Sequence, residues 1–529
     1  MKMNRTQNAV RNIITGSVLK LYQILVPFAM RTIMIYVLGV EYLGLNSLFT
    51  SVLQVLNLAE LGVGSAMTFA MYKPIVENDK KSINALMNLY KTYYRVIGGI
   101  VLLGGCAVIP FLPKLIKDDI PPDMNLYVLY FMNLFATVLS YWLFAYRNSI
   151  LQAHQRLDVV NKVTLITETI KYVLQISTLF IFKNYYIYVL ILLFTQMLTN
   201  VMTAYMSKKH FPDYKPEGKI DPEIKQGIDK KIKDLFTAKL GGVIVNSADT
   251  IVISSFLGLA MVGIYQNYYF VISAVMGFIT IIFNSCIAGI GNSLIVESKE
   301  KNYTDLKKLT FIIVFITAVC SACFISMFQP FITAWVGKKL LLPFPVVCCL
   351  VLYFIVYEFN ALFNVFKDAA GMWHEDRFRP LVTACSNLTM NLLTVKFLGL
   401  YGVVLSTVVA FLFIGIPWIL NNIFKTIFDR KDFKEYVLLV LGYFFEVIAI
   451  AALTYLPCYY IPLKGIPAVI VRLVVCIIVA PSLFFAVNFR KIEMLYLIEM
   501  INKFSKSKFL KIGFVKNFYD KRSAELKQN

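Results

Sequence analysis

Charged residues are scarce in this chain. Only 16% of its 529 residues are charged, and 58% are hydrophobic. Soluble domains usually carry about 25% charged residues. A chain with so few polar side chains cannot cover the surface of a water-soluble fold of this size. The sequence therefore predicts an integral membrane protein.

Histidine and acidic residues are also few. The chain has three histidines and 31 acidic residues against 52 basic ones, which gives a net charge of +21. The histidines lie in polar connections and most of the nine cysteines lie in apolar stretches. We therefore expect no metal site, because a metal needs converging ligands. Control of topology and attraction to anionic lipid headgroups at one membrane face explain the excess of cations. We therefore expect no nucleic-acid partner.

Long apolar runs make up most of the sequence. A membrane helix needs about 20 mostly apolar residues. Runs of this length and uniformity do not alternate with period two, which favours membrane helices over membrane strands. Fourteen spans are predicted: 10–38, 45–70, 86–112, 124–148, 159–182, 184–206, 234–257, 263–295, 308–333, 342–367, 379–396, 400–425, 435–457 and 466–489.

The distribution of basic residues sets the expected orientation, because cytoplasmic loops are enriched in lysine and arginine. With the N-terminus inside, most of the 52 basic residues fall in cytoplasmic segments. The outer loops then hold seven lysines: Lys114, Lys117, Lys183, Lys338, Lys339, Lys396 and Lys464. We predict a multi-pass protein of the bacterial plasma membrane with both termini in the cytoplasm.

One phrase occurs twice, which indicates two related halves. Residues 31–45 read RTIMIYVLGVEYLGL and residues 249–264 read DTIVISSFLGLAMVGI. Gly39 corresponds to Gly258 and Gly44 to Gly263, while a cation and an anion, Arg31 and Asp249, correspond with a one-residue slip. Six spans precede the second copy, so both copies have the same orientation and the repeat is parallel.

The repeat and the polar stretches predict the domain organisation. Two pseudo-symmetric six-helix bundles surround a central cavity, and two extra helices follow. The boundaries are 1–206 for the first bundle, 207–233 for a basic cytoplasmic linker, 234–425 for the second bundle, 426–489 for the extra spans and 490–529 for a basic amphipathic cytoplasmic tail.

Polar residues recur on single faces of these apolar spans, and such residues usually face protein or a water-filled cavity. Lys20, Pro27 and Arg31 share one face of the first span. Two cations on one face suit an anionic ligand such as a diphosphate. The other polar positions are Asn57 and Glu60; Glu168, Lys171 and Gln175; Asn246 and Asp249; and Asn360 and Asn364.

Structural roles compete with ligand binding at each of these positions. Glu168 and Lys171 could form an intrahelical pair, and Lys20 could reach the cytoplasmic headgroups. Arg31 could pair with an acid. The amide residues could form hydrogen bonds between helices. In the two extra spans, we expect Glu446 and Arg472 to pair.

Two segments resemble the Wzx-type polysaccharide flippases of the MOP/MATE-like exporter superfamily. They read LGVEYLGLNSLFTSVLQVLNLAELGVGSA at 38–66 and NSADTIVISSFLGLAMVGIYQNYYFV at 246–271. The resemblance implies two six-helix bundles around a V-shaped cavity, and no enzymatic activity. It also implies transport of undecaprenyl-diphosphate-linked oligosaccharides by alternating access, for capsule, O-antigen or teichuronic acid synthesis.

The resemblance also suggests roles for the polar residues. Arg31, Lys20 and Lys171 become candidates for binding the diphosphate or acidic sugars. Asp249, Glu60 and Glu168 become candidates for sugar binding, ion coupling or gating, with Asn246, Asn57, Gln175, Asn360 and Asn364 completing the polar interior. No cofactor is implied, and an H+ or Na+ gradient or the membrane potential is the expected driving force. Membrane lipids, a polysaccharide polymerase and glycosyltransferases are the expected partners beside the lipid-linked substrate.

Other classes fit the sequence less well. A MATE-like exporter of small cations predicts an acidic cavity and usually twelve spans. A membrane glycosyltransferase or polymerase needs a catalytic constellation, and the longest outer loop, about residues 113–123, is too short for a domain. A scaffold without transport would leave the polar faces unexplained.

Cysteine accessibility tests the predicted orientation. A cysteine at position 338 (Lys338→Cys) should react with a membrane-impermeant maleimide in intact cells, because its loop is expected outside. Lys219→Cys, in the linker, is the matched inner control and should react only after permeabilisation. Labelling only after permeabilisation at position 338 would reverse the topology.

Overall fold

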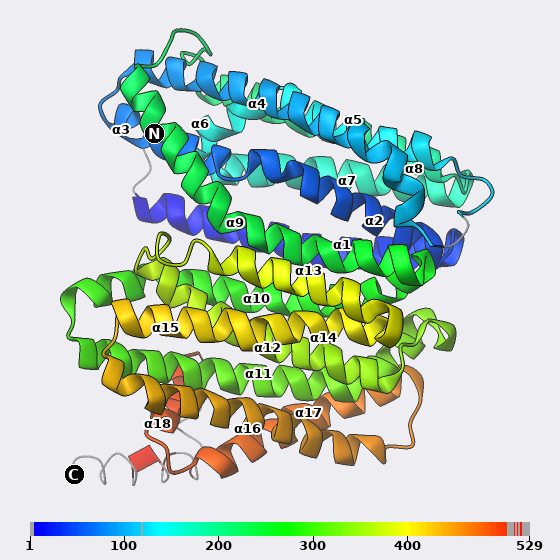
Figure 1. The fold of residues 1–529 in the computed structure, drawn as a ribbon, viewed down its shortest axis with the longest axis vertical. Helices are drawn as coiled ribbons and strands as arrows, with labels where there is room; N and C mark the ends of the chain where they lie inside the picture. The colour runs from blue at the N-terminus through cyan, green and yellow to red at the C-terminus, as the bar shows by residue number, and fades with distance from the viewer. Residues whose placement is uncertain (1–4, 118–119, 505–512, 514–515, 517–518, 521–529) are drawn as a thin grey trace. The chain divides into compact units, whose positions relative to one another are not determined.

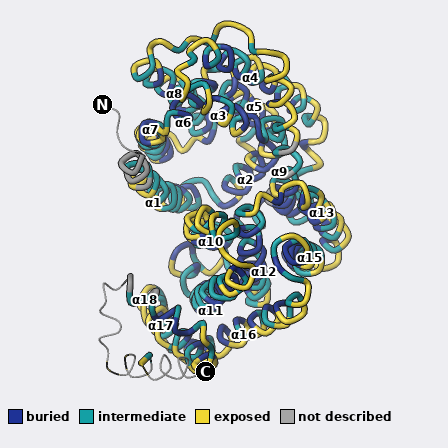
Figure 2. The backbone as a smooth tube through the Cα atoms, turned by 90° about the vertical axis from the view of Figure 1, so that its left-hand side faces the viewer, coloured by how far each residue is buried: buried dark blue, intermediate teal, exposed yellow. Residues whose placement is uncertain are grey.

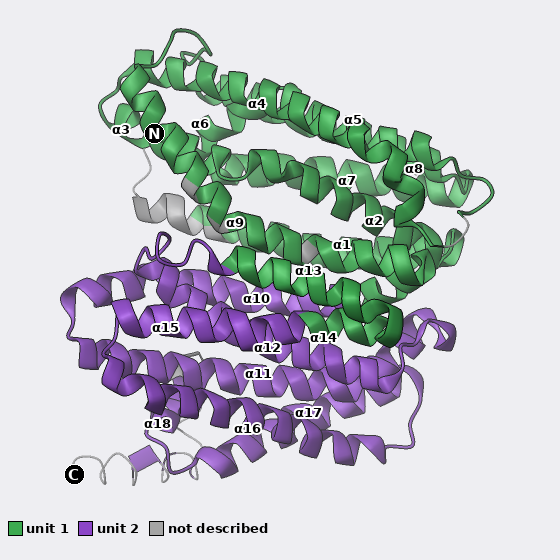
Figure 3. Ribbon diagram, viewed as in Figure 1, with its two compact units in different colours: residues 1–267, 380–406 green, residues 268–379, 407–529 purple. Residues whose placement is uncertain are grey.

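The computed structural model describes residues 5–117, 120–504, 513, 516, 519 and 520 (Figure 1). Inside helices, the side chains of 5–10, 13, 234, 238, 246, 500, 503 and 504 are not described. The described elements are all helical, as predicted. They form two compact units, unit 1 with residues 1–267 and 380–406, and unit 2 with residues 268–379 and 407–529 (Figure 3).

Unit 1 holds the first half of the chain and returns for a later helix. Its elements are α1 (Arg5–Val37), α2 (Val40–Leu56), η1 (Asn57–Glu60), α3 (Val63–Val76), α4 (Lys80–Val108), η2 (Ile109–Leu115), α5 (Leu126–Trp142), η3 (Ala145–Arg147), α6 (Asn148–Ala153), α7 (Leu157–Ile181), α8 (Tyr185–His210), α9 (Pro222–Leu257), the start of α10 (Leu259–Val296), nearly all of α13 (Arg379–Leu398) and the start of α14 (Leu400–Ala410).

Unit 2 holds the rest of α10 and the later helices. Its remaining elements are α11 (Lys299–Val336), η4 (Lys338–Leu340), α12 (Phe344–Ala369), the end of α14, η5 (Phe411–Gly415), α15 (Ile416–Thr426), η6 (Arg430–Asp432), α16 (Phe433–Tyr459), α17 (Gly465–Asn488) and α18 (Glu493–Phe504). Buried positions run as stripes along helices of both units and alternate with exposed ones (Figure 2).

The number of membrane spans differs from the prediction. Each predicted range coincides with a helix or a broken helix. In the described residues, twelve helices are long and apolar enough to cross a membrane, or thirteen with the bent pair α5–α6 counted as one span. The expected fourteen are not shown. The shortfall is α7, whose polar stripe lowers its hydropathy, and its crossing stays a prediction.

Two predicted spans are broken. The range 45–70 contains the short helix η1 between α2 and α3, where Gly62 has a φ of 87°. The range 124–148 bends by 48° between α5 and α6, beside Phe144 with a φ of 57°. Breaks at membrane depth free backbone groups that need new partners, so they occur where protein surrounds them.

The predicted bundle boundaries stay a prediction, because compactness alone does not test the repeat. The polar linker does contain a non-helical stretch, and α9 begins within it at Pro222. Most of the tail lies outside the described residues. Its described helix α18 buries Met494, Leu497 and Ile498.

The expected pair of Glu446 and Arg472 is wrong. Arg472 Nη1 donates to the backbone carbonyl of Ser326 at 3.0 Å. Pro330 lies four residues further along α11 and has no N–H, so it leaves this carbonyl without its helical donor. Glu446 instead accepts a hydrogen bond from Asn488 and lies 3.8 Å from Lys491.

The repeated glycine corners contact each other within unit 1. Gly39 and Gly258 have φ values of 122° and 92°, and they turn the chain into α2 and out of α9. A Cβ on Gly44 would lie 2.0 Å from the carbonyl oxygen of Leu259, and a Cβ on Gly263 would lie 2.4 Å from that of Val40. Only glycine allows this approach of helix to backbone.

This contact is reciprocal. With the correspondence set by the repeat, Val40 is the equivalent of Leu259 and Gly44 is the equivalent of Gly263. Gly44 contacts Leu259, and Gly263 contacts Val40, so exchanging each residue for its equivalent turns one contact into the other. This is the pattern of a twofold contact. The described corners thus show a reciprocal contact between the two copies of the phrase, and the parallel orientation of the repeat stays a prediction.

Adding one methyl group tests the close approach. Gly44→Ala and Gly263→Ala should each destabilise the protein by about 1–3 kcal/mol, because the backbone must move apart. Gly99→Ala is the matched control, since nothing lies within 4 Å of its added Cβ. Thermal unfolding in detergent measures the difference, and equal melting of all three variants would contradict the contact.

Candidate functional site

The polar face of α1 packs against α7 inside unit 1. Gln23 Nε2 donates to Glu168 Oε1 at 3.1 Å, which ties the two helices together. The other oxygen of Glu168 is buried and makes no hydrogen bond in the described part of the chain. An anionic oxygen in this condition is costly at membrane depth, so this carboxylate is a candidate for a ligand or an ion.

Arg31 lies two turns beyond Gln23 on α1. Its Nη1 donates to Asn267 Oδ1 on α10 at 3.3 Å, so this contact holds the guanidinium with an amide rather than an acid. Lys20 lies three residues before Gln23 and is half-buried. The predicted row of cations on α1 therefore shares its face with a residue that contacts α7.

Lys171 and Gln175 continue the polar stripe of α7. The Lys171 Nζ lies 4.2 Å from the ring centroid of Tyr172. No ion pair joins it to Glu168 among the salt bridges of the described residues. Gln175 is buried and donates to the carbonyl of Tyr188 at 3.2 Å, which ties α7 to α8. Lys171 therefore keeps a candidate ligand role, whereas the contact of Gln175 is structural.

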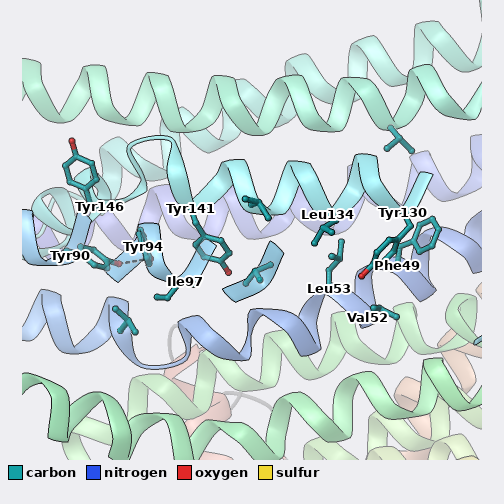
Figure 4. Packing of buried hydrophobic residues seen from close by; sticks show 14 of the residues in the cluster. Phe49, Val52, Leu53, Tyr90, Tyr94, Ile97, Tyr130, Leu134, Tyr141 and Tyr146 are labelled. Atoms are coloured by element: carbon teal, nitrogen blue, oxygen red, sulfur yellow. Dashed lines mark hydrogen bonds between the residues drawn. The ribbon is translucent and has the colours of Figure 1, made fainter. Parts of the chain in front are cut away.

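Glu60 faces a polar cavity of about 260 Å³ within unit 1. Its Oε1 accepts a hydrogen bond from the Tyr94 hydroxyl at 2.9 Å, and Tyr94 accepts one from Tyr90 at 2.7 Å (Figure 4). Asn148 and Lys239 also line the cavity. This chain of hydroxyls leads from the carboxylate into the buried tyrosine cluster shown in Figure 4.

The helix break positions this carboxylate. Gly62 follows η1 in the left-handed conformation, and a Cβ there would lie 2.6 Å from Leu235 Cβ of α9. Glu60 ends η1 and so projects from the break rather than from a regular helix. Asn57 begins η1, and its buried Oδ1 makes no hydrogen bond among the described residues. The sequence identified both polar residues but not the break.

Asp249 is buried on α9 and accepts a hydrogen bond from Asn391 Nδ2 of α13 at 2.7 Å. The side chain of Asn246 lies outside the described residues. Asn391 was missed by sequence reasoning, although Asn387 and Asn391 are four residues apart and share one face of α13. That spacing in an apolar span was the signal that could have identified them.

Asn360 and Asn364 lie in unit 2, in a buried network around Arg379. Arg379 donates to Asn360 Oδ1 at 3.3 Å and to Asn364 Oδ1 at 2.8 Å, and it pairs with Asp376 at 2.7 Å. Asn422 also donates to Asp376 at 3.2 Å. These contacts join α12, α13 and α15, so the structure gives the two asparagines structural partners. Their predicted place in a cavity is not tested.

Metal ligands do not converge in the described residues: no group of three or more His, Cys, Asp or Glu side chains could hold an ion. Outside the membrane spans, His154 stacks on Phe211 with ring centroids 4.2 Å apart. Burial lowers the pKa of the His154 imidazole, because it disfavours the charged form. This histidine therefore packs as an apolar ring against Phe211, which lies just after α8.

The fold and the site define a multi-pass helical membrane protein that carries charged side chains inside its apolar spans. A family model described as "Polysaccharide biosynthesis protein" matches residues 9–288, more than half of the chain. The chain belongs to this family. A comparison with curated protein sequences finds no match.

Solved structures share the fold. The chain is similar to the lipid II flippase MurJ in its inward closed conformation, with 13% identity over 90% of this chain and 99% of that one and a TM-score of 0.60. It is also similar to a mutant of the Vibrio cholerae MATE transporter VcmN, with 14% identity, coverage of 80% and 98%, and a TM-score of 0.54. A further match is the outward-facing conformation of a multidrug resistance MATE family transporter of the MOP superfamily, with 16% identity, coverage of 80% and 96%, and a TM-score of 0.52.

Removing one hydroxyl tests the Glu60 network. Tyr94→Phe should destabilise the protein by about 1–3 kcal/mol, because it deprives Glu60 and Tyr90 of a shared partner. Tyr141→Phe is the matched control, since its ring lies 5.5 Å from that of Tyr94. Thermal unfolding in detergent should separate the two variants, and identical melting would show that the hydroxyl chain contributes nothing.

Proposed function

We propose that this protein is a flippase for undecaprenyl-diphosphate-linked oligosaccharides in the bacterial plasma membrane, working by alternating access with both termini in the cytoplasm. The observation that carries the proposal is the row of cations on the polar face of α1 in a member of the polysaccharide biosynthesis protein family. The similarity in fold to a structure named as a lipid II flippase supports it. Its product would serve capsule, O-antigen, teichuronic acid or related polymers.

The chemistry of the substrate matches the side chains of unit 1. A diphosphate is anionic, and pairs of its oxygens suit the forked donors of Arg31. Lys20 and Lys171 add point charges on α1 and α7. The sugar part needs hydrogen-bonding groups, and the second oxygen of Glu168 can supply one.

Energy for directional export would come from an ion or from the membrane potential. Glu60 in its polar cavity and Asp249 beside Asn391 are the proposed coupling groups of unit 1, because both are carboxylates that accept hydrogen bonds from polar side chains inside apolar spans. A polymerase and glycosyltransferases are the proposed protein partners, acting after and before transport.

Loss of the protein tests the function directly. Deletion should abolish one surface polysaccharide while its lipid-linked repeat units accumulate on the inner leaflet, because assembly continues and export stops. Glycan staining of the surface and mass spectrometry of extracted lipids measure the two effects. An unchanged surface with altered susceptibility to cationic drugs would instead favour the MATE-like small-molecule exporter.

Arg31→Ala should reduce export at least about tenfold, equivalent to about 1.4 kcal/mol, with unchanged protein abundance, because a diphosphate contact is lost. Asn267→Ala is the matched control, since it removes one hydrogen-bond partner of Arg31 but leaves the cation. Export measured in vesicles from cells carrying each variant distinguishes the roles. A collapse of abundance in Arg31→Ala, or equal losses in both variants, would make Arg31 structural.

A further inference from the structure

Unit 2 contains a carboxylate that none of the sites above uses. Glu358 lies in the middle of α12 and is only 1% exposed. Both of its carboxylate oxygens are buried, and neither accepts a hydrogen bond from the described residues. Moving an ionised carboxylate into such surroundings is so costly that the group becomes neutral instead.

The neighbouring helix α11 offers polar groups but no cation at this level. The two helices are joined by a short turn and run antiparallel, and Phe324 packs on Phe354 with ring centroids 5.0 Å apart. One turn further along each helix, Cys320 comes opposite Glu358, and the two side chains are close enough to interact electrostatically.

Two hydroxyl residues of α11 flank Cys320. Thr317 and Ser321 are buried, and their side-chain oxygens make no hydrogen bonds in the described part of the chain. Among the described residues, the two hydroxyls of α11 and the two carboxylate oxygens of α12 are thus a set of buried polar atoms without hydrogen-bond partners on two neighbouring helices. Such atoms are rare in folded proteins and indicate a missing proton, ion or water.

Cys320 and Tyr357 are the titratable groups of α11 and α12 that interact electrostatically with Glu358. Tyr357 precedes it on α12. On α16, Glu446 is held by Asn488 and Lys491. Along η5 and α15, the one titratable residue is Lys425 in the last turn. Lys367 lies near the end of α12 and pairs with Asp368 at 3.0 Å.

We propose that Glu358 is a proton-binding site that couples a proton gradient to transport, which rests on the proposed transport function. When water reaches the site, the carboxylate takes up one proton from hydronium and becomes a neutral acid. When the site is buried, the acid keeps this proton, and renewed access to water on the other side releases it. The neutral acid can donate to a hydroxyl oxygen of α11.

Sodium fits this place less well, because it requires several oxygen ligands and often recruits carbonyls of unwound helices. Both α11 and α12 are continuous helices here. Pro330 frees the carbonyl of Ser326 in α11, and Arg472 already donates to it. One carboxylate and two hydroxyls therefore suit a proton.

Infrared difference spectroscopy of the full chain in lipid nanodiscs tests the site without any transport substrate. Raising the pH should remove a protonated-carboxyl band in the unmodified protein, and Glu358→Gln should lack that band. Glu446→Gln is the matched control, because Glu446 is a half-buried acid of unit 2 that has partners, and it should keep the band. Glu358→Asp, which keeps the carboxyl, should shift the band and serves if the glutamine variant does not fold.

Two results would overturn the proposal. One is a protonated-carboxyl band that is unchanged in Glu358→Gln. The other is a band that responds to exchange of potassium for sodium at fixed pH, which would make the site a sodium site. In liposomes, Glu358→Gln should lose the pH dependence of lipid-linked oligosaccharide movement. If the band belongs to Glu358 but the unmodified protein moves no such lipid, the proposed function fails and the proton site stands.

Discussion

Hydrocarbon offers no hydrogen bonds, and this constraint favours protein partners for the polar side chains of the described spans. In unit 1 three charged residues contact amides: Glu168 with Gln23, Arg31 with Asn267, and Asp249 with Asn391. An amide fixes the orientation of a charged group without itself cancelling the charge. Arg379 in unit 2 differs, because Asp376 neutralises it within a buried network. The first arrangement suits binding, and the second suits stability.

Much of the fold follows from the sequence, because the length of an apolar run and the polar residues that end it are local properties. Every predicted span coincides with a helix or broken helix, and the polar faces of α1 and α7 do contact each other. The breaks were not predicted. Gly62 adopts its positive φ where an added Cβ would meet Leu235 of α9, and Phe144 adopts its positive φ at the bend before η3; no local pattern reports either feature.

Partners were predicted less well than positions. Helix periodicity identifies the face on which a residue lies but not the helix opposite, so Glu446 and Arg472 were paired wrongly. The freed carbonyl behind Pro330 is a backbone feature, and charge matching overlooks it. Glu358 was overlooked for a related reason. A lone acid in an apolar run forms no stripe, and only its packing shows that it lacks a partner.

The reciprocal contact of the glycine corners uses backbone atoms on one side and the absence of a side chain on the other. Few side-chain atoms take part in it, and Val40 Cγ2 beside Gly263 is one of them. The first copy of the phrase can therefore carry the cation Arg31 and the second copy the anion Asp249 while the same backbone contact is kept. A contact made mainly by backbone atoms does not restrict the charge of the side chains around it. Corresponding positions in the two copies can then differ in charge and take different roles.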